Sequence, residues 1–325
     1  MTQSPNISLP VALFKGLRPK QIPKNLFVYV ALVFSNNLFN PKMLGMVTVA
    51  FTLFCLVAGS VYLMNDILDV EADRQHPKKR LRPIASGALP IPVAKAASVL
   101  LMTGSVGASF AFGWQFGAVV LCYLVLQIFY CFRGKHIVLV DVFMLAAGFV
   151  LRVVAGAAII HVRSTPWLLL FSFQLALFLG FGKRRQEIVL LGADAEKQRA
   201  ILEEYSLPFL DQIIVMIAGI TIVCYSVYSV QSGTSLKLPH LWATTPLVIY
   251  GVCRYLYLVY QKGWGGAPDE ALREDRALQV VIAIWLALVL ILFKFDRPFN
   301  INTPESDKGG KEVKVNARKN TSGAP

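Results

Sequence analysis

The stretch from Met43 to Pro83 reads MLGMVTVAFTLFCLVAGSVYLMNDILDVEADRQHPKKRLRP. Its first part, Met43 to Met64, contains no charged residue and is long enough to cross a bilayer, which takes about 20 apolar residues in a helix. Asn65 and Asp66 follow at once, although the apolar Ile67 and Leu68 come after them. The stretch therefore predicts a transmembrane helix that ends in an acidic, polar site.

Similar apolar runs occupy most of the chain. They fall at roughly 25–40, 43–64, 92–112, 114–132, 137–160, 166–182, 207–231, 241–261 and 277–295. The first run is the weakest, because Asn36 and Asn37 interrupt it. Hydrophobic residues make up 55% of the sequence and charged residues only 16%, and the mean hydropathy is +0.56. We expect an all-α polytopic membrane protein with about nine transmembrane helices. Residues 1–297 are expected to form a single transmembrane catalytic domain, and the polar residues 298–325 a disordered tail.

The formal net charge of +13 does not indicate a nucleic-acid partner, because the basic residues lie in short loops between apolar runs. One alternate set of loops holds Lys15, Arg18, Lys20, Lys24, Arg74, Lys78, Lys79, Arg80, Arg82, Lys95, Arg133, Lys135, Lys183, Arg184, Arg185, Lys197, Arg199, Lys262, Arg273 and Arg276. The other set holds only Lys42, Arg163 and Lys237. Since Lys and Arg are retained in the cytosol, we expect a plasma-membrane protein with a cytosolic N-terminus and acidic site and an external C-terminus.

The acidic residues Asp66, Asp69 and Asp73 are three and four positions apart. On a helix that continues past Met64 they share one face, with Asn65 at its edge. Three carboxylates in a partly dry site repel one another, and a bound cation removes this repulsion. Mg²⁺ is held in proteins by one or two carboxylates together with substrate phosphates. The spacing therefore predicts a magnesium–diphosphate site; the alternative is a solvated helix end whose acids pair with Arg74, Lys78 and Lys79.

A basic run, KKRLRP from Lys78 to Pro83, follows the acidic motif. Arg offers bidentate hydrogen bonds to phosphate, and Lys offers a point charge. We expect Lys78, Arg80 and Arg82 to contact substrate phosphate, although the same charges also serve to orient the protein in the membrane.

The segment NDILDVEADRQHPKKRLRPIASG, Asn65 to Gly87, resembles the first Asp-rich motif of the UbiA prenyltransferase superfamily. The resemblance implies nine helices around an active-site cavity that faces the cytosol. Three further segments are similar to the polyprenyl-phosphate phosphoribosyltransferase branch of that superfamily: LRPKQIPKN (Leu17 to Asn25), FRGKHIVLVDVFMLAAGFVLRVVAG (Phe132 to Gly156) and FGKRRQEI (Phe181 to Ile188).

The last segment departs from members that prenylate aromatic acceptors, which have a second Asp-rich motif there. Here the loop carries Lys183 and Arg184, with Glu187 as its only early acid. A basic cluster beside an acidic one suits phosphoribosyl diphosphate (PRPP), which has a 5-phosphate besides its diphosphate. The resemblance implies Mg²⁺-dependent phosphoribosyl transfer to a polyprenyl phosphate, providing a lipid-linked precursor for cell-wall arabinan.

Two other functions stay open on the sequence. One is transfer of a prenyl group from a lipid diphosphate to an aromatic or other small acceptor, by the same fold. The other is transport, which intramembrane charges also permit, although no inverted repeat is visible. The expected partners are PRPP, a polyprenyl phosphate and membrane lipids, with no nucleic acid; the sequence leaves the oligomeric state open.

Further substrate-contacting candidates lie in or beside the apolar runs. They are Lys24, Asn25, Tyr62, Lys135, Asp141 and Arg152. Asp141 and Arg152 are about three helical turns apart in one predicted span, and charged residues within a membrane usually face a functional cavity. The alternatives are a structural ion pair for Asp141 and Arg152, side-chain packing for Tyr62 and a snorkelling role for Lys24.

Overall fold

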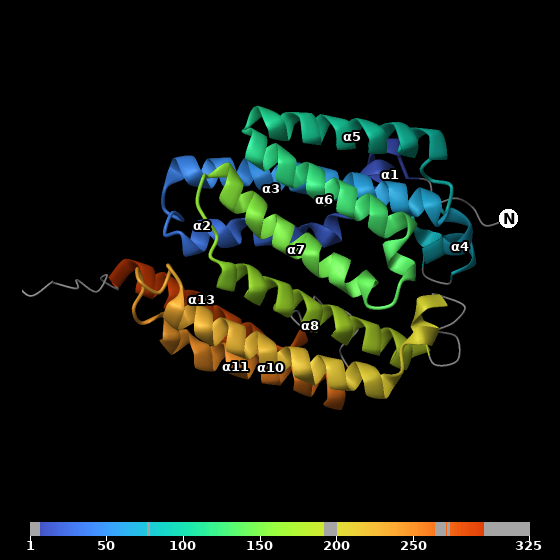
Figure 1. The fold of residues 1–325 in the computed structure, drawn as a ribbon. Coiled ribbons are helices and arrows are strands. Elements are labelled where there is room, and N and C mark those ends of the chain that lie inside the picture. Colours follow the sequence, from blue (N-terminus) through green and yellow to red (C-terminus); the bar gives the residue numbers. More distant parts are fainter. Residues whose placement is uncertain (1–6, 77–78, 192–199, 264–270, 272–273, 296–325) are drawn as a thin grey trace, which may run out of the picture.

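The structure is a computed structural model that describes residues 7–76, 79–191, 200–263, 271 and 274–295. All regular elements in these ranges are helical (Figure 1). They are α1 (Leu9–Gly16), η1 (Pro19–Tyr29), α2 (Val30–Phe34), α3 (Pro41–Leu68), α4 (Val70–Gln75), η2 (Lys79–Leu81), α5 (Ile91–Ala111), α6 (Trp114–Phe132), η3 (Gly134–His136), α7 (Val140–Ile159), α8 (Pro166–Leu191), η5 (Ala200–Glu204), α10 (Leu207–Gln231), η6 (Leu241–Thr244), α11 (Thr245–Gln261) and α13 (Arg276–Phe295), where η marks a 3-10 helix. The expected all-α fold is confirmed.

Within the described residues, seven helices are long and apolar enough to cross a membrane: α3, α5, α6, α7, α8, α10 and α13. The chain is an integral membrane protein. The expected count of nine is not confirmed, because two predicted spans have other forms. Residues 241–261 fold as the four-residue η6 followed by the 17-residue α11, and residues 25–40 are not one α-helix.

The predicted first span instead forms the end of η1 and the five-residue α2. Pro23 lies inside η1 and has no N–H to donate, so a regular α-helix cannot pass through this position. Asn36, with a φ of 61°, then turns the chain toward α3. The segment still runs between two ends of the helix bundle, since Arg18 contacts Asp66 at one end and the carbonyl of Phe34 accepts a hydrogen bond from Thr234 at the other.

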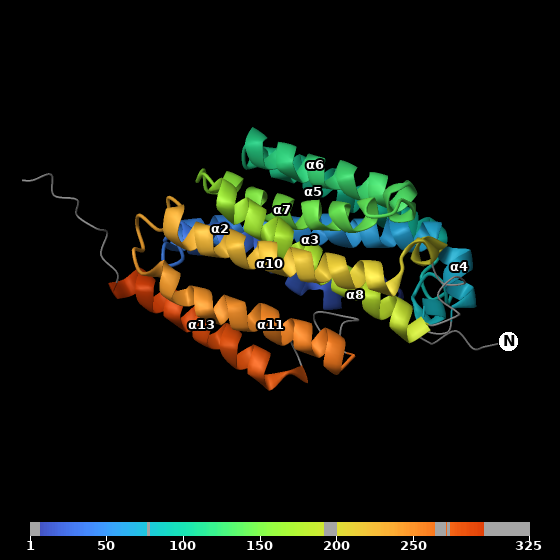
Figure 2. The ribbon, with the colours of Figure 1, turned by 60° about the horizontal axis from the view of Figure 1, so that its bottom comes forward.

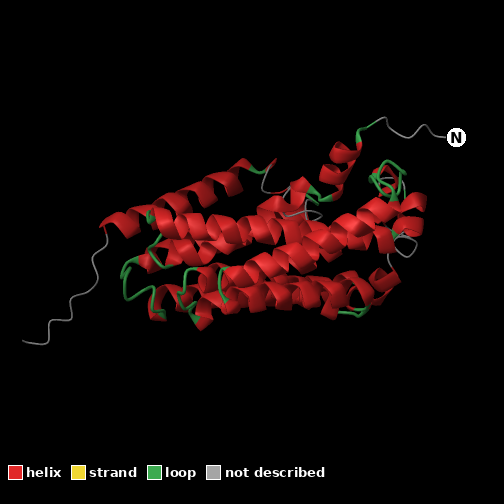
Figure 3. Cartoon of the chain, turned by 90° about the horizontal axis from the view of Figure 1, so that it is seen from above, coloured by secondary structure: helices red, strands yellow, loops and turns green. Residues whose placement is uncertain are grey.

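We call these ends proximal and distal. The proximal end holds α4, the end of α3, the start of α7 and the end of α8; the distal end holds α2, the start of α3, the end of α7 and the start of α8 (Figure 1). The long helices run lengthwise beside one another (Figure 3). The N-terminal helix α1 lies toward the proximal end (Figure 1), whereas α13 finishes at the distal end (Figures 1 and 2).

Helix α7 is the centre of the packing. Its residues Val142 and Ala146 belong to a buried cluster with α8, α10 and α11, and its residues Ala155 and Ile159 belong to another with α3 and α6. At Gly156 a Cβ atom would lie 1.9 Å from the carbonyl oxygen of Val28, so only glycine lets η1 pack this closely on α7. The polar residues that η1, α3 and α7 carry are therefore held at fixed positions.

Two expectations lie outside the described residues. They are the phosphate contact of Lys78 and the character of the tail 298–325. The single-domain organisation of residues 1–297 also stays a prediction.

Candidate active site

The acidic motif lies at the proximal end, where α3 ends at Leu68 and α4 begins at Val70. Asp69 stands between the two helices, and the backbone N–H of Asp73 bonds to the carbonyl of Asp69 at 2.8 Å. Asp66 and Asp73 are each 2% exposed. Both contact one atom, Nη1 of Arg82, with Asp66 Oδ1 at 3.1 Å and Asp73 Oδ2 at 2.5 Å. Two buried carboxylates thus share one guanidinium.

Arg18 is a second cation beside Asp66. Its Nη2 contacts Asp66 Oδ1, and its guanidinium lies 4.9 Å from the ring centroid of Tyr62. Arg18 is not among the site residues expected from the sequence, although it lies in the segment Leu17 to Asn25 that carries the family resemblance. Its own backbone, with a φ of 54°, starts η1 and directs the chain toward α3.

Asp69 faces another cation, Lys135 of η3. Lys135 Nζ donates to Asp69 Oδ1 at 2.7 Å and to Asn65 Oδ1 at 3.5 Å, and Asn65 Nδ2 donates to Asp69 Oδ2 at 2.9 Å. The three predicted carboxylates therefore pair with different cations, Asp66 and Asp73 with Arg82 and Asp69 with Lys135. That they share one helix face stays a prediction, since α3 ends at Leu68 and α4 begins at Val70.

Other predicted phosphate contacts differ in their environment. Arg80 is exposed, whereas Lys24, Tyr62 and Lys183 are half-buried. Glu71, also in the acidic motif, is exposed and pairs with Arg74 at 2.8 Å. The motif thus contains both buried and solvated acids.

Asp141 does not join the acidic motif. It is fully buried at the start of α7, where its Oδ2 accepts from Arg184 Nε at 2.7 Å and its Oδ1 accepts from the hydroxyl of Tyr205 at 2.8 Å. Arg184 also donates to Glu187 at 2.7 Å. Burial and the neighbouring Asp141 raise the pKa of Tyr205, so its hydroxyl stays protonated and acts as a donor. This network joins α7, α8 and η5, which favours the structural alternative for Asp141.

Arg152 is 5% exposed and is held by neutral acceptors. Its Nε donates to Asn25 Oδ1, its Nη1 to the carbonyl of Gly148 and its Nη2 to the hydroxyl of Tyr123, each at 2.8 Å. The guanidinium also lies 4.8 Å from the ring centroid of Tyr123. The structure thus brings two separately predicted site residues, Arg152 and Asn25, into contact in the bundle interior, apart from the acidic motif.

The chemistry of these donors fits a divalent cation. No group of three His, Cys, Asp or Glu side chains in the described chain is arranged to hold a metal ion by itself. However, Asp66 and Asp73 converge on the Arg82 nitrogen, and Asp69 and Asn65 converge on the Lys135 ammonium. A position that binds a cation with hard oxygens from two side chains suits Mg²⁺, which completes its shell with water and substrate phosphates.

The fold and the charged cluster define an integral membrane protein with an acid- and base-rich site at one end of its helix bundle. The model of the UbiA prenyltransferase family matches residues 25–271, and the chain belongs to this family of transferases. It is 34% identical over 294 residues to a decaprenyl-phosphate phosphoribosyltransferase of Corynebacterium glutamicum, covering 89% of each chain. It is 32% identical to the enzyme of that name from Mycolicibacterium smegmatis, covering 89% of this chain and 94% of the relative.

Among solved structures, a UbiA homolog from Archaeoglobus fulgidus bound to GPP and Mg²⁺ matches with a TM-score of 0.67. The match covers 87% of this chain and 99% of the other, at 16% sequence identity. At this identity the match shows the shared helical fold.

Proposed function

We propose that this protein transfers the 5-phosphoribosyl group of PRPP to a polyprenyl phosphate and releases diphosphate. The observation that carries the proposal is the convergence of Asp66, Asp69 and Asp73 with Arg18, Arg82 and Lys135 from separate segments. A site of mixed charge binds a metal and several phosphate groups at once. The names of relatives that match along 89% of the chain support phosphoribosyl transfer in particular.

Magnesium would be held by Asp66 and Asp73, and by Asp69 with Asn65. When bound, it supplies a Lewis acid that stabilises negative charge on the departing diphosphate. The solved relative that contains Mg²⁺ supports a divalent metal in this fold.

Arg18, Arg82 and Lys135 would exchange partners as substrate binds. Each now contacts a carboxylate, and each would turn to a phosphate oxygen once a metal neutralises that carboxylate. Arg82 and Arg18 both contact Asp66 Oδ1, so both guanidinium groups are close enough to bind one diphosphate. The site thereby keeps its charge balanced in both states.

In the reaction, the bond between ribose C1 and the diphosphate oxygen breaks, and a bond from C1 to an oxygen of the acceptor phosphate forms. C1 gains oxocarbenium character, as at other glycosidic centres. The acceptor oxygen is already anionic, so no general base is needed. Positive charge from Arg18 and Arg82 acts where negative charge develops on the leaving group.

The remaining predicted contacts have weaker support. Arg184 is occupied by Asp141 and Glu187, so we assign it to the structure of the proximal end and not to the donor's 5-phosphate. Lys183, Lys24 and Arg80 remain proposed phosphate contacts. We also propose that the proximal end faces the cytosol, where PRPP is dissolved, and that the lipid tail of the acceptor stays in the bilayer.

The test is incubation of the purified protein with Mg²⁺, ribose-labelled PRPP and polyprenyl phosphate. Label should move into the organic phase, and diphosphate should appear in equal amount. If no label moves while an aromatic acid becomes prenylated from a lipid diphosphate, the protein is instead a prenyltransferase. Accumulation of solute in sealed vesicles, unchanged by Asp66→Ala, would support a transporter.

A further inference from the structure

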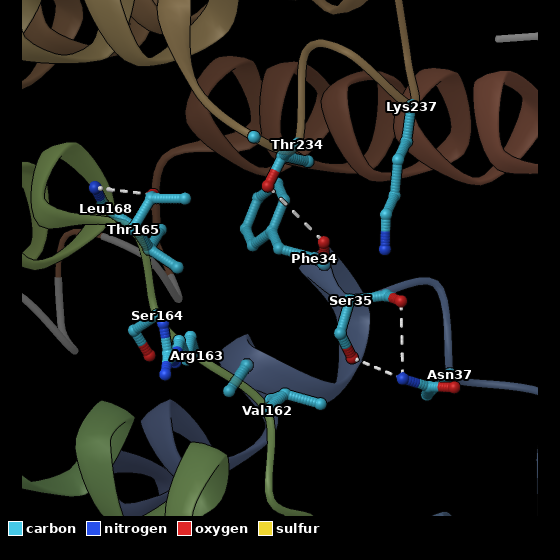
Figure 4. A pocket seen from close by; sticks show the side chains of 12 residues that line it. Phe34, Ser35, Asn37, Val162, Arg163, Ser164, Thr165, Leu168, Thr234 and Lys237 are labelled. Carbon is cyan, nitrogen blue, oxygen red and sulfur yellow. Dashed lines mark hydrogen bonds between the residues drawn. The ribbon is translucent and has the colours of Figure 1, made fainter.

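A cavity of about 440 Å³ lies at the distal end, away from the acidic motif. Three chain segments form its walls: the end of α2 with the turn after it, the α7–α8 loop and the α10–η6 loop (Figure 4). A volume of this size is within the range of about 300–1,000 Å³ that is typical of ligand pockets. The cavity therefore has room for more than a single small ion.

The charge of this cavity is entirely positive. Arg163 comes from the α7–α8 loop and Lys237 from the α10–η6 loop, and the lining contains no acidic residue. Neither cation makes an ion pair with the residues that the structure describes. The sequence has no Asp or Glu in 35–42, 159–166 or 231–245, so these distal loops offer no counterion of their own. Of the three basic residues expected on this face, only Lys42 lies outside the cavity lining.

Polar groups line the same cavity beside Arg163. The Ser164 hydroxyl oxygen is buried and has no hydrogen-bond partner among the described residues. Thr165 Oγ1 accepts from the backbone N–H of Leu168 at 3.3 Å, which leaves its own hydrogen for a ligand. These two residues directly precede the 26-residue α8, whose N-terminus adds partial positive charge. A buried hydroxyl without a partner is rare, because it loses the hydrogen bond it made in water.

The walls are tied together before any ligand binds. Asn37 Nδ2 donates to Ser35 Oγ at 2.9 Å and to the carbonyl of Ser35 at 3.3 Å, and Thr234 Oγ1 donates to the carbonyl of Phe34 at 3.5 Å (Figure 4). Apolar residues complete the lining: Ala31, Phe34, Val162 and Leu168. A lining that is cationic in one part and apolar in another, at the ends of membrane-spanning helices, matches the boundary between a lipid headgroup and its chains.

We propose that this cavity binds the phosphate headgroup of an anionic lipid from the leaflet opposite the acidic motif. Arg163 and Lys237 hold the phosphate, the Ser164 hydroxyl donates to one of its oxygens, and the apolar lining contacts the adjoining part of the lipid. The site is separate from the proposed transfer site, since it lies at the other end of α7 and α8.

The experiment measures lipid binding to the full chain by native mass spectrometry in a neutral detergent. The probes are phosphatidylglycerol, phosphatidylcholine, polyprenyl phosphate and inorganic phosphate. The test variant is Arg163→Gln combined with Lys237→Gln, and Ser164→Ala is a milder one. Lys42→Gln is the matched control, because it removes a distal cation that does not line the cavity.

We expect phosphatidylglycerol to bind the unaltered protein at least about tenfold more tightly than phosphatidylcholine, and the double variant to lose this preference. Lys42→Gln should keep it, and Ser164→Ala should weaken it without abolishing it. If the double variant still prefers phosphatidylglycerol to phosphatidylcholine, the proposal is overturned. If inorganic phosphate binds as tightly as phosphatidylglycerol, and the double variant loses this binding too, the cavity binds a soluble anion and the lipid assignment is overturned. Tighter binding of polyprenyl phosphate than of phosphatidylglycerol, lost in the double variant, would support the proposal and identify a phosphomonoester lipid as its ligand.

Discussion

Asp66 and Asp73 are almost completely buried, and each is paired with a guanidinium group. Asp66 contacts Arg18 and Arg82, whereas Asp73 contacts Arg82. Removing one partner from a buried ion pair leaves an uncompensated charge, which is more costly than removing both. In the proposed function these carboxylates would hold a divalent cation, and Arg18 and Arg82 would then contact the phosphates of the substrate.

At the residue scale, the first prediction concerns these carboxylates. Asp66→Asn or Asp73→Asn should lower the rate of phosphoribosyl transfer at least about 100-fold, because each removes a metal-binding oxygen next to the leaving group. The Mg²⁺ concentration for half-maximal rate should rise, as measured by release of diphosphate. Glu71→Gln is the control from the same motif, since Glu71 is solvated and pairs with Arg74, and it should stay within about threefold of the unaltered rate.

The second prediction concerns Arg18. Arg18→Gln should raise the KM for PRPP about tenfold, because a charge-assisted hydrogen bond to phosphate is worth about 1.5–3 kcal/mol. Lys20→Gln removes an exposed charge two residues away and should leave KM unchanged. Steady-state kinetics over a range of PRPP concentrations separates KM from kcat. If Arg18→Gln and Lys20→Gln raise the KM equally, PRPP binding depends on the overall positive charge of the N-terminal segment and not on a specific contact of Arg18.

At the scale of elements, α7 and α8 are joined by the ion pair between Asp141 and Arg184, whose side chains are 0% and 3% exposed. Arg184→Gln should lower the free energy of unfolding by about 3–5 kcal/mol, because the buried Asp141 loses the cation that pairs with it. Adding Asp141→Asn should recover part of this loss. Denaturant unfolding of the single and double variants in detergent gives the coupling energy of the pair. A double variant as unstable as the sum of the two single variants would contradict a direct ion pair.

The packing of η1 on α7 gives the fourth prediction. Gly156→Ala places a methyl group against the carbonyl of Val28 and should destabilise the protein by about 1–3 kcal/mol. It should also lower transfer activity, because η1 follows directly from Arg18 and carries Asn25. Gly107→Ala in α5 meets no atom within 4 Å and should leave thermal stability unchanged or slightly higher. Thermal unfolding of the two variants, followed by a fluorophore under the same conditions, gives the melting temperatures to compare.

These elements also show what the sequence could and could not predict. The apolar run ending in Asn65 and Asp66 predicted α3 and its acidic end. The length of an apolar run and the position of acidic residues at its end can both be read from neighbouring residues in the sequence. The 3-10 form of η1 depends on Pro23 and on close packing against Gly156, so a hydrophobicity pattern alone does not contain it. Arg18 is far from Asp66 in sequence, and its contact follows from the path of η1. The sequence also did not predict which residue pairs with Asp141, since Arg184 lies in another helix.

At the scale of the whole molecule, charge is divided between the two ends of the bundle. The acidic residues that the structure describes lie in the segments that meet at the proximal end or in the loops that follow them. The distal loops carry only Lys42, Arg163 and Lys237. Because α1 lies proximally and α13 ends distally, the chain passes between the ends an odd number of times (Figure 1). This agrees with termini on opposite sides of the membrane, although the orientation itself stays a prediction.

The last prediction tests that orientation. In a variant whose five cysteines are replaced by serine, Lys237→Cys should react with a membrane-impermeant maleimide on intact cells, because the positive-inside rule puts the distal end outside. Lys79→Cys should react only after the membrane is permeabilised, and Ser322→Cys in the tail should behave like Lys237→Cys. The cysteine-free protein gives the background. The reverse pattern would place the acidic motif outside the cell, where PRPP is not supplied, and would contradict the proposed donor together with the topology.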